Sequence, residues 1–197
     1  MQLTSNLAYL LGSLRDGSIC RFKSNQGKIC SSVTFYSKSR EWLKILQIKI
    51  LDVFERTTKI VQYGNKTPYL RIYSKELVNK LNGEFQCPLK TQIGWITPLP
   101  IKASNNPEII KNYIAGFWDA EGGANLKSQQ IALYLSWNGN DCPPLEDLKA
   151  MLEKFEITLV EKILSHELKL DLEQVFSDIV RSPEAINTAA ALAKLAQ

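Results

Sequence analysis

Three acidic residues, each at or near the end of an apolar helix, are the first candidates for chemistry in this sequence. Asp119 and Glu121 lie near the end of "YIAGFWDAEGG" (residues 113–123), and Asp16 lies near the end of "AYLLGSLRDGS" (residues 8–18). The helix dipole disfavours negative charge at a C-terminal end. Carboxylate oxygens are the ligands that divalent cations such as Mg²⁺ prefer, so a bound cation would offset that cost.

Only one of the two acids in the second stretch can serve the same purpose as Asp16. Asp119 and Glu121 are two positions apart, so on a helix their side chains point about 200° away from each other. Glu121, like Asp16, directly precedes glycine, and these two acids are 105 residues apart. We therefore expect Glu121 to be the counterpart of Asp16, and Asp119 to make a local hydrogen bond or to face solvent.

Small side chains occupy the middle of both helices. Ala115, Gly116 and Ala120 lie where a packing helix normally carries large residues, and Gly12 and Ser13 lie on the first helix. Glycine inside a helix costs about 1 kcal/mol relative to alanine, so it needs a structural reason. Helices approach closely only where the facing side chains are small, and we expect these two helices to pack against each other.

The spacing between glycine and acid differs between the two helices. Gly116 precedes Glu121 by five residues, but Gly12 precedes Asp16 by four, a difference of about 100° of helix rotation. Either the first helix tightens near its end, or Gly12 forms a hollow for a bulky side chain of the partner helix.

The elements expected after the first helix repeat after the second. In the first half, strands are expected at about 18–24 and 29–37 with a helix at 39–54; in the second half, strands at about 123–127 and 129–137 with a helix at 144–155. Each half continues with a second hairpin and a further helix, expected at 57–73 and 74–81 in the first half and at 157–172 and 172–180 in the second. The predicted fold is α+β, a duplicated αββαββα unit with domains at 1–98 and 99–197. The stretch 82–107 joins them, and an Ala-rich helix is expected at 182–196.

Charge is distributed unevenly along the chain. Its 197 residues are 45% hydrophobic and 22% charged, which is ordinary for a soluble globular protein. Residues 1–98 contain 15 Lys and Arg against 6 Asp and Glu, whereas residues 99–197 contain 9 against 14. A basic half with interspersed Tyr, Ser, Asn and Gln is typical of a surface that binds a polyanion.

Two classes of protein are disfavoured. The apolar run "LAYLLGSL" is too short to span a membrane and is followed at once by charged residues, so we expect an intracellular protein of the cytoplasm, nucleoid or an organelle matrix. The four cysteines lack CxxC spacing and His166 is the only histidine, which disfavours a zinc site. We expect the cysteines to be buried thiols.

The stretch "IAGFWDAEG" resembles the nine-residue signature of the LAGLIDADG homing endonucleases, and "YLLGSLRDGS" resembles a divergent first copy. The resemblance, to the single-chain, two-motif, intron-encoded type of archaea and organelles, covers nearly the whole chain. It implies a pseudo-twofold monomer, with two antiparallel sheets forming a DNA-binding saddle, that needs no protein or membrane partner. Such a protein binds a long asymmetric double-stranded DNA site and cuts both strands with divalent metal.

The resemblance also implies roles for individual residues. Asp16 and Glu121, with the glycines Gly17 and Gly122 that follow them, would hold two or three Mg²⁺ ions at the helix ends and against the DNA phosphates. Lys38 matches the position of a basic residue near the attacking water. Its counterpart in the second half is about Gly139, which predicts that the two strands are cut at unequal rates.

The hairpins would supply DNA recognition. A two-stranded ribbon fits the major groove, where Arg and Lys donate to guanine and Asn or Gln bonds adenine. Alternation predicts one apolar face, with Cys20, Phe22, Ile29, Val33 and Phe35. The opposite face of both halves would contact DNA through Arg21, Lys23, Asn25, Lys28, Ser32, Thr34, Tyr36, Tyr69, Arg71, Tyr73, Asn125, Lys127, Gln130, Tyr134, Ser136 and Lys169.

Two other functions remain open from the sequence. An RNA maturase of the same fold would assist intron splicing and would not need Asp16 and Glu121, both of which are present. A DNA-binding regulator without chemistry would be expected to have lost one of the acids. Cleavage assays distinguish these alternatives from an endonuclease.

Overall fold

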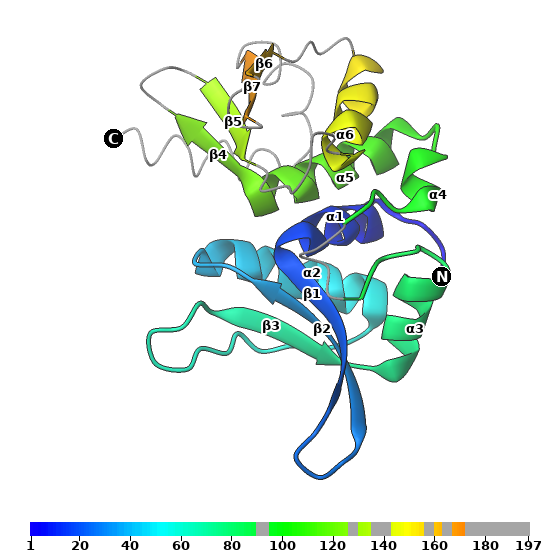
Figure 1. Ribbon diagram of the computed structural model, residues 1–197, viewed down its shortest axis with the longest axis vertical. Helices are drawn as coiled ribbons and strands as arrows, with labels where there is room; N and C mark the ends of the chain where they lie inside the picture. The colour runs from blue at the N-terminus through cyan, green and yellow to red at the C-terminus, as the bar shows by residue number, and fades with distance from the viewer. Residues whose placement is uncertain (90–94, 126–129, 135–142, 156–159, 163–166, 172–197) are drawn as a thin grey trace. The chain divides into compact units, whose positions relative to one another are not determined.

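The computed structural model describes residues 1–89, 95–125, 130–134, 143–155, 160–162 and 167–171 (Figure 1). The chain packs into two compact units, Met1–Ala120 and Glu121–Gln197. The first unit therefore contains most of the helix that opens the second sequence repeat. The predicted domain boundary at 98/99 separates the two sequence repeats, whereas the compact units are defined by packing. The packing therefore does not test that boundary, which stays a prediction.

The first unit is built in the order predicted for the first repeat, extended by two helices. Its elements are α1 (Ser5–Ser13), the 3₁₀ turn η1 (Leu14–Asp16), β1 (Gly17–Lys23), β2 (Ile29–Tyr36), α2 (Arg40–Phe54), β3 (Tyr69–Tyr73), α3 (Lys75–Gly83), α4 (Leu99–Lys102) and α5 (Pro107–Glu121).

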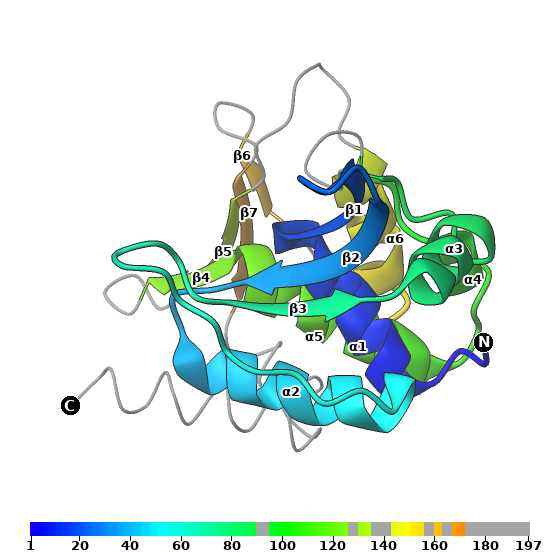
Figure 2. The same cartoon turned by 90° about the horizontal axis from the view of Figure 1, so that it is seen from below.

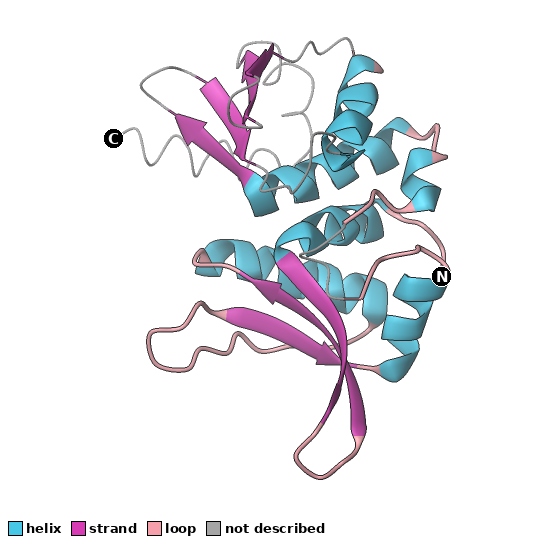
Figure 3. Cartoon of the chain, viewed as in Figure 1, coloured by secondary structure: helices cyan, strands magenta, loops and turns pink. Residues whose placement is uncertain are grey.

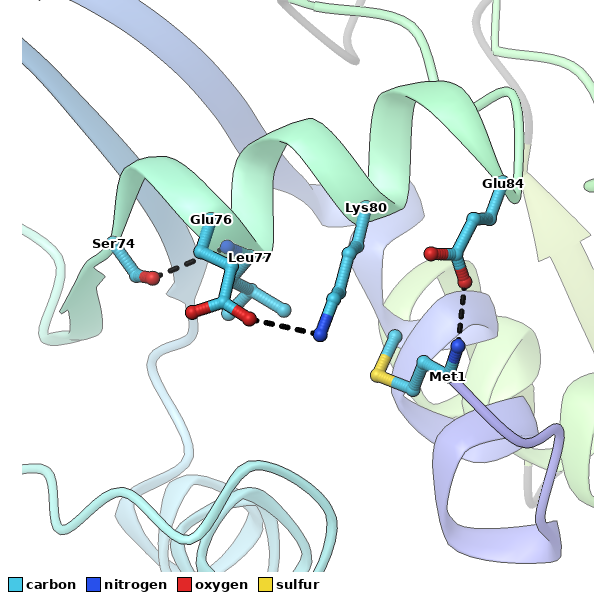
Figure 4. Close-up of polar contacts among 6 residues, drawn as sticks. All are labelled: Met1, Ser74, Glu76, Leu77, Lys80 and Glu84. Atoms are coloured by element: carbon cyan, nitrogen blue, oxygen red, sulfur yellow. Dashed lines mark hydrogen bonds and ion pairs between the residues drawn. The ribbon is translucent and has the colours of Figure 1, made fainter.

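Serine and threonine N-caps fix where three of the helices begin. The side chain of Thr4 accepts a hydrogen bond from the backbone N–H of Leu7 at the start of α1. Ser39 caps α2 and Ser74 caps α3 in the same way. A side-chain acceptor at this position satisfies a backbone donor that has no partner within the helix. Figure 4 shows the Ser74 cap and, further along α3, the bond between Lys80 and Glu76 at 2.8 Å.

The sheet of the first unit is antiparallel, in the order β1-β2-β3. Helices α1 and α2 lie along one side of it (Figures 1 and 2). Ile19 pairs with Val33, and Phe35 pairs with Leu70; all four are fully buried. The core therefore lies between this sheet face and the helices.

The first hairpin has a different register from the one predicted. Cys20 pairs with Ser32 and Phe22 pairs with Cys30, so the placement of Cys20 and Phe22 on the core face is wrong. Both lie on the opposite, polar face. Arg21 follows Ile19 at a spacing of two and so lies on the core side, where its guanidinium donates to Asn79 of α3 at 2.8 Å.

The cause of this shift is the connection between the strands. The backbone N–H of Ser24 donates to the carbonyl of Lys28 at 2.8 Å, so the loop has three residues, Asn25 to Gly27, and not the four of "SNQG". Gly27 adopts a φ of 77°, a conformation that glycine adopts without strain. A change of one residue in loop length exchanges the two faces of one strand relative to the other.

The second hairpin of the first half is reduced to one strand and one bridge. β3 forms as expected, but its predicted partner contributes only the isolated pair Val61–Tyr69. Upstream, the carbonyl of Thr58 accepts a hydrogen bond from the side chain of Gln47 on α2 at 2.7 Å. That segment is therefore held by a helix side chain instead of a strand ladder.

The second unit contains a four-stranded antiparallel sheet in the order β4-β5-β7-β6 (Figure 3). Its elements are β4 (Gly122–Asn125), β5 (Gln130–Tyr134), α6 (Pro143–Glu153), β6 (Val160–Lys162) and β7 (Glu167–Asp171). The second hairpin predicted for this half is confirmed. The helices predicted at 172–180 and 182–196 lie outside the described residues, as do Cys142 and His166.

Three cysteines are described, and all three are free thiols. Cys87 is buried, as expected, and burial raises the pKa of its thiol to about 12. Cys20 and Cys30 are only half-buried. No described helix combines the length and the apolar character needed to cross a membrane.

Candidate functional site

Helices α1 and α5 are in direct backbone contact at two glycines. A Cβ added to Gly116 would lie 2.0 Å from the carbonyl oxygen of Tyr9 and 3.0 Å from Oγ of Ser13. A Cβ added to Gly12 would lie 2.2 Å from the carbonyl oxygen of Tyr113 and 2.6 Å from the backbone nitrogen of Phe117. The predicted close packing of these two helices is confirmed.

Of the two explanations proposed for the unequal glycine-to-acid spacing, the structure confirms the first. The first helix tightens at its end, because residues Leu14–Asp16 form a 3₁₀ turn after α1. Such a turn has about 3.0 residues per turn instead of 3.6, which changes the direction of Asp16. The second explanation is wrong, because the atoms nearest to Gly12 are backbone atoms of Tyr113, Gly116 and Phe117 and not a bulky side chain.

Gly116→Ala should destabilise the protein. The new Cβ would meet backbone atoms, which cannot rotate away, and overpacking of this kind costs about 1–3 kcal/mol, more than the roughly 1 kcal/mol that alanine gains in helix propensity. Urea unfolding would measure the loss. Gly83→Ala is the matched control, since a Cβ at that helical glycine has nothing within 4 Å; equal stability of the two variants would contradict the close packing.

Asp16 ends the 3₁₀ turn and is half-buried. Burial raises the pKa of its carboxyl, and the positive charge of Arg15 opposes that rise. The next residue, Gly17, begins β1, and a Cβ there would lie 2.7 Å from the carbonyl oxygen of Thr34. Gly17 therefore lets β1 begin directly against β2, immediately after the acid.

Asp16→Asn should stabilise the metal-free protein at neutral pH. The raised pKa means that the charged carboxylate is less favourable in the folded chain than in the unfolded chain, whose value is about 3.9. Below that value the carboxyl is neutral in both states and the penalty vanishes; it grows as pH rises through the folded pKa. Unfolding in EDTA should show a gain at pH 7 that shrinks toward pH 4. Asp52→Asn, at an exposed carboxylate, should give no comparable gain; a pH-independent effect of Asp16→Asn would refute this account.

Glu121 is the last residue of α5 and is half-buried; Gly122 begins β4. Lys38 is exposed, in the short connection between β2 and α2. The flanking serines order this connection: Ser37 Oγ accepts from the N–H of Ser39 at 3.0 Å. Within the part of the chain that the structure describes, no three His, Cys, Asp or Glu side chains form a metal-binding group. Gly139 lies outside that part.

Asp119 is half-buried, and its carboxylate makes a long-range hydrogen bond that the prediction did not include. Its carboxylate accepts a hydrogen bond from the hydroxyl of Tyr9 on α1. The same hydroxyl accepts a bond from the indole N–H of Trp42 on α2 at 2.9 Å. No local pattern in the sequence predicts this contact, because Tyr9 and Asp119 are 110 positions apart.

A cluster of aromatic rings surrounds Arg71 on the polar face of the first sheet. The guanidinium carbon of Arg71 lies 4.8 Å from the ring centre of Tyr69 and 5.9 Å from that of Tyr73, within the range of cation–π attraction. Nε of Arg71 donates to the hydroxyl of Thr34 at 3.0 Å. We call this group the tyrosine–arginine cluster; it comprises Arg71, Tyr36, Tyr63, Tyr69 and Tyr73.

The cluster changes the roles of several predicted DNA contacts. Ser32 and Thr34 are only 1% and 0% exposed, so they lie beneath the accessible surface, and Thr34 serves to hold Arg71. Tyr63 was missed from the sequence, although it is 66% exposed and its ring lies 6.3 Å from that of Tyr69. The available signal in the sequence was the position of Tyr63 directly before Gly64, which indicates an aromatic residue in a turn.

The remaining predicted DNA contacts fall into three groups. Lys23, Asn25 and Lys28 are exposed at the end of the β1–β2 hairpin, whereas Arg21 is bonded to α3. In the second unit only the backbone of the predicted contacts is described, at Asn125 in β4, Gln130 and Tyr134 in β5, and Lys169 in β7. Lys127 and Ser136 lie outside the described residues.

A family model described as a LAGLIDADG-like domain matches residues 108–167. The chain is 31% identical over 153 residues to homing endonuclease I-ApeI of Aeropyrum pernix; the match covers 75% of this chain and 65% of the length of that relative.

Solved structures with the same fold were also found. I-DmoI in complex with DNA and Mn matches with a TM-score of 0.67 at 19% identity, over 92% of this chain and 99% of that one. The N-terminal LAGLIDADG domain of DUF199/WhiA matches with a TM-score of 0.51 at 9% identity, over 91% of this chain and 81% of that one. The matched segment 108–167 includes the signature that ends in Glu121 and Gly122; this segment is a LAGLIDADG-like domain, and the chain has the LAGLIDADG fold.

Proposed function

We propose that the protein is a homing endonuclease that cuts both strands of a long, asymmetric DNA site with divalent metal ions, acting as a single chain. The observation that carries the proposal is the close crossing of α1 and α5, the two helices of the duplicated signature, with an acid retained at the end of each. The relative from Aeropyrum pernix, which is named a homing endonuclease, supports the same activity.

The donor residues fit a divalent metal. Asp16 and Glu121 supply carboxylate oxygens, the ligands that Mg²⁺ prefers; Mg²⁺ also keeps several waters and binds substrate phosphates, so two protein carboxylates suffice. Burial already raises the pKa of Asp16, and a cation beside it would favour the charged form. Structures of I-DmoI have been solved with Mn, Mg and Ca. For this chain we propose Mg²⁺, in two or three ions.

A bound divalent ion would lower the pKa of water and offset the charge that develops on the phosphate. Residues of the chain would hold the ions and place charge near the reacting groups. Asp16 and Glu121 would hold the ions, and Lys38 would place a positive charge near the attacking water. The serines that order its connection limit the positions that Lys38 can reach.

The DNA-binding surface would be the polar face of the first sheet together with the exposed end of its hairpin. The tyrosine–arginine cluster holds the guanidinium of Arg71 in place before DNA arrives. A held guanidinium can donate two hydrogen bonds to one guanine in the major groove. Lys23 and Lys28 are exposed and suit contact with phosphates.

Selection of cleaved sites from a randomised duplex library would test the proposal. With Mg²⁺ present, we expect one long and asymmetric family of cleaved sequences, with both strands cut. Tight duplex binding without cleavage in Mg²⁺ or Mn²⁺ would overturn the proposal in favour of a DNA-binding regulator. Preference for a structured intron RNA without cleavage would overturn it in favour of a maturase.

A further inference from the structure

We propose that Tyr9 is a positioning residue for Glu121: its hydroxyl holds Asp119 and so fixes the last turn of α5. The proposal rests on the proposed function, in which Glu121 binds metal. It assigns a role to two residues, Tyr9 and Asp119, that lie outside the predicted metal and DNA contacts.

Donor and acceptor chemistry fixes the direction of both hydrogen bonds. An indole N–H only donates and an ionised carboxylate only accepts. The Tyr9 hydroxyl therefore accepts from Trp42 at 2.9 Å and must donate its single proton to Asp119. A hydrogen bond from a hydroxyl to a carboxylate is about twice as strong as a neutral one.

The ring of Tyr9 is itself held firmly. Tyr9 is 1% exposed and Trp42 is 8% exposed, so neither side chain has room to turn. The ammonium of Lys49 lies 4.4 Å from the centre of the Tyr9 ring and also donates to Asn6 of α1 at 2.9 Å. The hydroxyl that meets Asp119 is therefore anchored by both α1 and α2.

Tyr9 contacts α5 at two points, about one helical turn apart. Its backbone carbonyl packs against Gly116, and its hydroxyl bonds Asp119. Two contacts on one face define the rotation of a helix better than one, and they lie just before the residue proposed to bind metal. The last turn also carries acids where the helix dipole disfavours them, so without this bond it would fray more readily.

The contact has no counterpart in the other repeat. At the 105-residue offset, Tyr9 corresponds to Ile114 and Asp119 corresponds to Leu14, which is 1% exposed. An apolar pair cannot form the hydrogen bond. Tyr9 therefore positions only Glu121, the acid of the second signature. The position of Asp16 is set by the 3₁₀ turn and by Gly17.

Tyr9→Phe tests the proposal because it removes the hydroxyl and keeps the ring. Hydrogen exchange on the metal-free, DNA-free protein should show faster exchange of the last-turn amides of α5. Single-turnover cleavage should fall about 10- to 100-fold, as expected for a small misplacement of a catalytic group. DNA affinity should change less than about threefold.

Tyr113→Phe is the matched control. Tyr113 is also a buried tyrosine whose hydroxyl accepts an indole N–H, from Trp95 at 3.4 Å, and it lies earlier on α5. Its loss should lower stability to a similar degree and leave both cleavage and last-turn exchange unchanged. If the two variants lower cleavage equally, Tyr9 has only a structural role and the proposal is overturned.

A double-mutant cycle of Tyr9→Phe with Asp119→Leu tests whether Tyr9 acts through its bond to Asp119. Leucine is the residue at the corresponding position of the first repeat, Leu14. If Tyr9 acts through Asp119, the double variant should cut no more slowly than the slower single variant. Asp119→Asn, which keeps an acceptor, should retain most of the activity. Additive losses, or unchanged last-turn exchange in Tyr9→Phe, would overturn the proposal; absence of cleavage by the unmodified chain would instead overturn the proposed function.

Discussion

Asp16→Asn and Glu121→Gln should each abolish double-strand cleavage while leaving DNA affinity within about threefold of the original. Each change replaces a charged oxygen ligand with a neutral amide, which binds divalent cations poorly. The metal contributes several kcal/mol of charge stabilisation to the transition state. Because each 1.4 kcal/mol is a factor of ten in rate, the loss should be at least about 1,000-fold.

Single-turnover cleavage of a selected site in Mg²⁺ would measure the rates, and binding in EDTA would measure affinity. Binding should survive because neither acid lies in the tyrosine–arginine cluster or the β1–β2 hairpin. Glu76→Gln is the control: it removes an exposed carboxylate that pairs with Lys80 on α3, so cleavage should not change. Full cutting by either site variant would exclude that acid as a metal ligand.

Gly12 and Gly116 could be assigned to a helix contact from the sequence because each obeys a local rule. A glycine inside an apolar helix needs a close neighbour, and Gly12 and Gly116 each have one. The positions of Ser39 and Ser74 before amphipathic runs marked the starts of α2 and α3. The helix caps depend on residues that are near in the sequence. The contact between the glycines could be predicted because the repeat indicates which distant helix is the partner.

The parts that could not be predicted depend on one-residue details and on contacts without a repeat. The three-residue loop at Gly27 exchanged the faces of Arg21 and Cys20, and alternation alone does not reveal loop length. The bond from Tyr9 to Asp119 breaks the symmetry between the two signatures. Alignment of the two repeats therefore gives no indication of it.

DNA binding should be steeply dependent on salt, with log K falling by about 0.9 for each phosphate that is neutralised. If about 6–10 phosphates are contacted, affinity would fall about 10³- to 10⁵-fold between 50 and 200 mM salt. The excess of positive charge in residues 1–98 leads us to expect that this half makes most of these contacts. Fluorescence anisotropy at several salt concentrations would measure the slope.

Deletion of single charges tests where the contacts lie. Lys23→Met and Arg71→Met should each flatten the slope more than Lys127→Met or Lys169→Met does, because only the first half carries a strong positive excess. Lys80→Met removes a lysine that is paired with Glu76 on α3, so it should leave the slope unchanged. Equal effects in the two halves would show that the uneven charge has no role in binding.

Arg71→Lys separates charge from base recognition. The substitution keeps the positive charge, so the salt slope should stay within about 0.3 of the original, since a full phosphate contact is worth about 0.9. Lysine lacks the planar fork that donates to Thr34 and stacks on Tyr69. Discrimination at one base pair should therefore fall by about 1–3 kcal/mol, the usual value of a bidentate contact. If the variant discriminates between base pairs at every position of the site as the original does, Arg71 contacts the DNA backbone. The tyrosine–arginine cluster would then hold a positive charge against a phosphate and would not recognise a base.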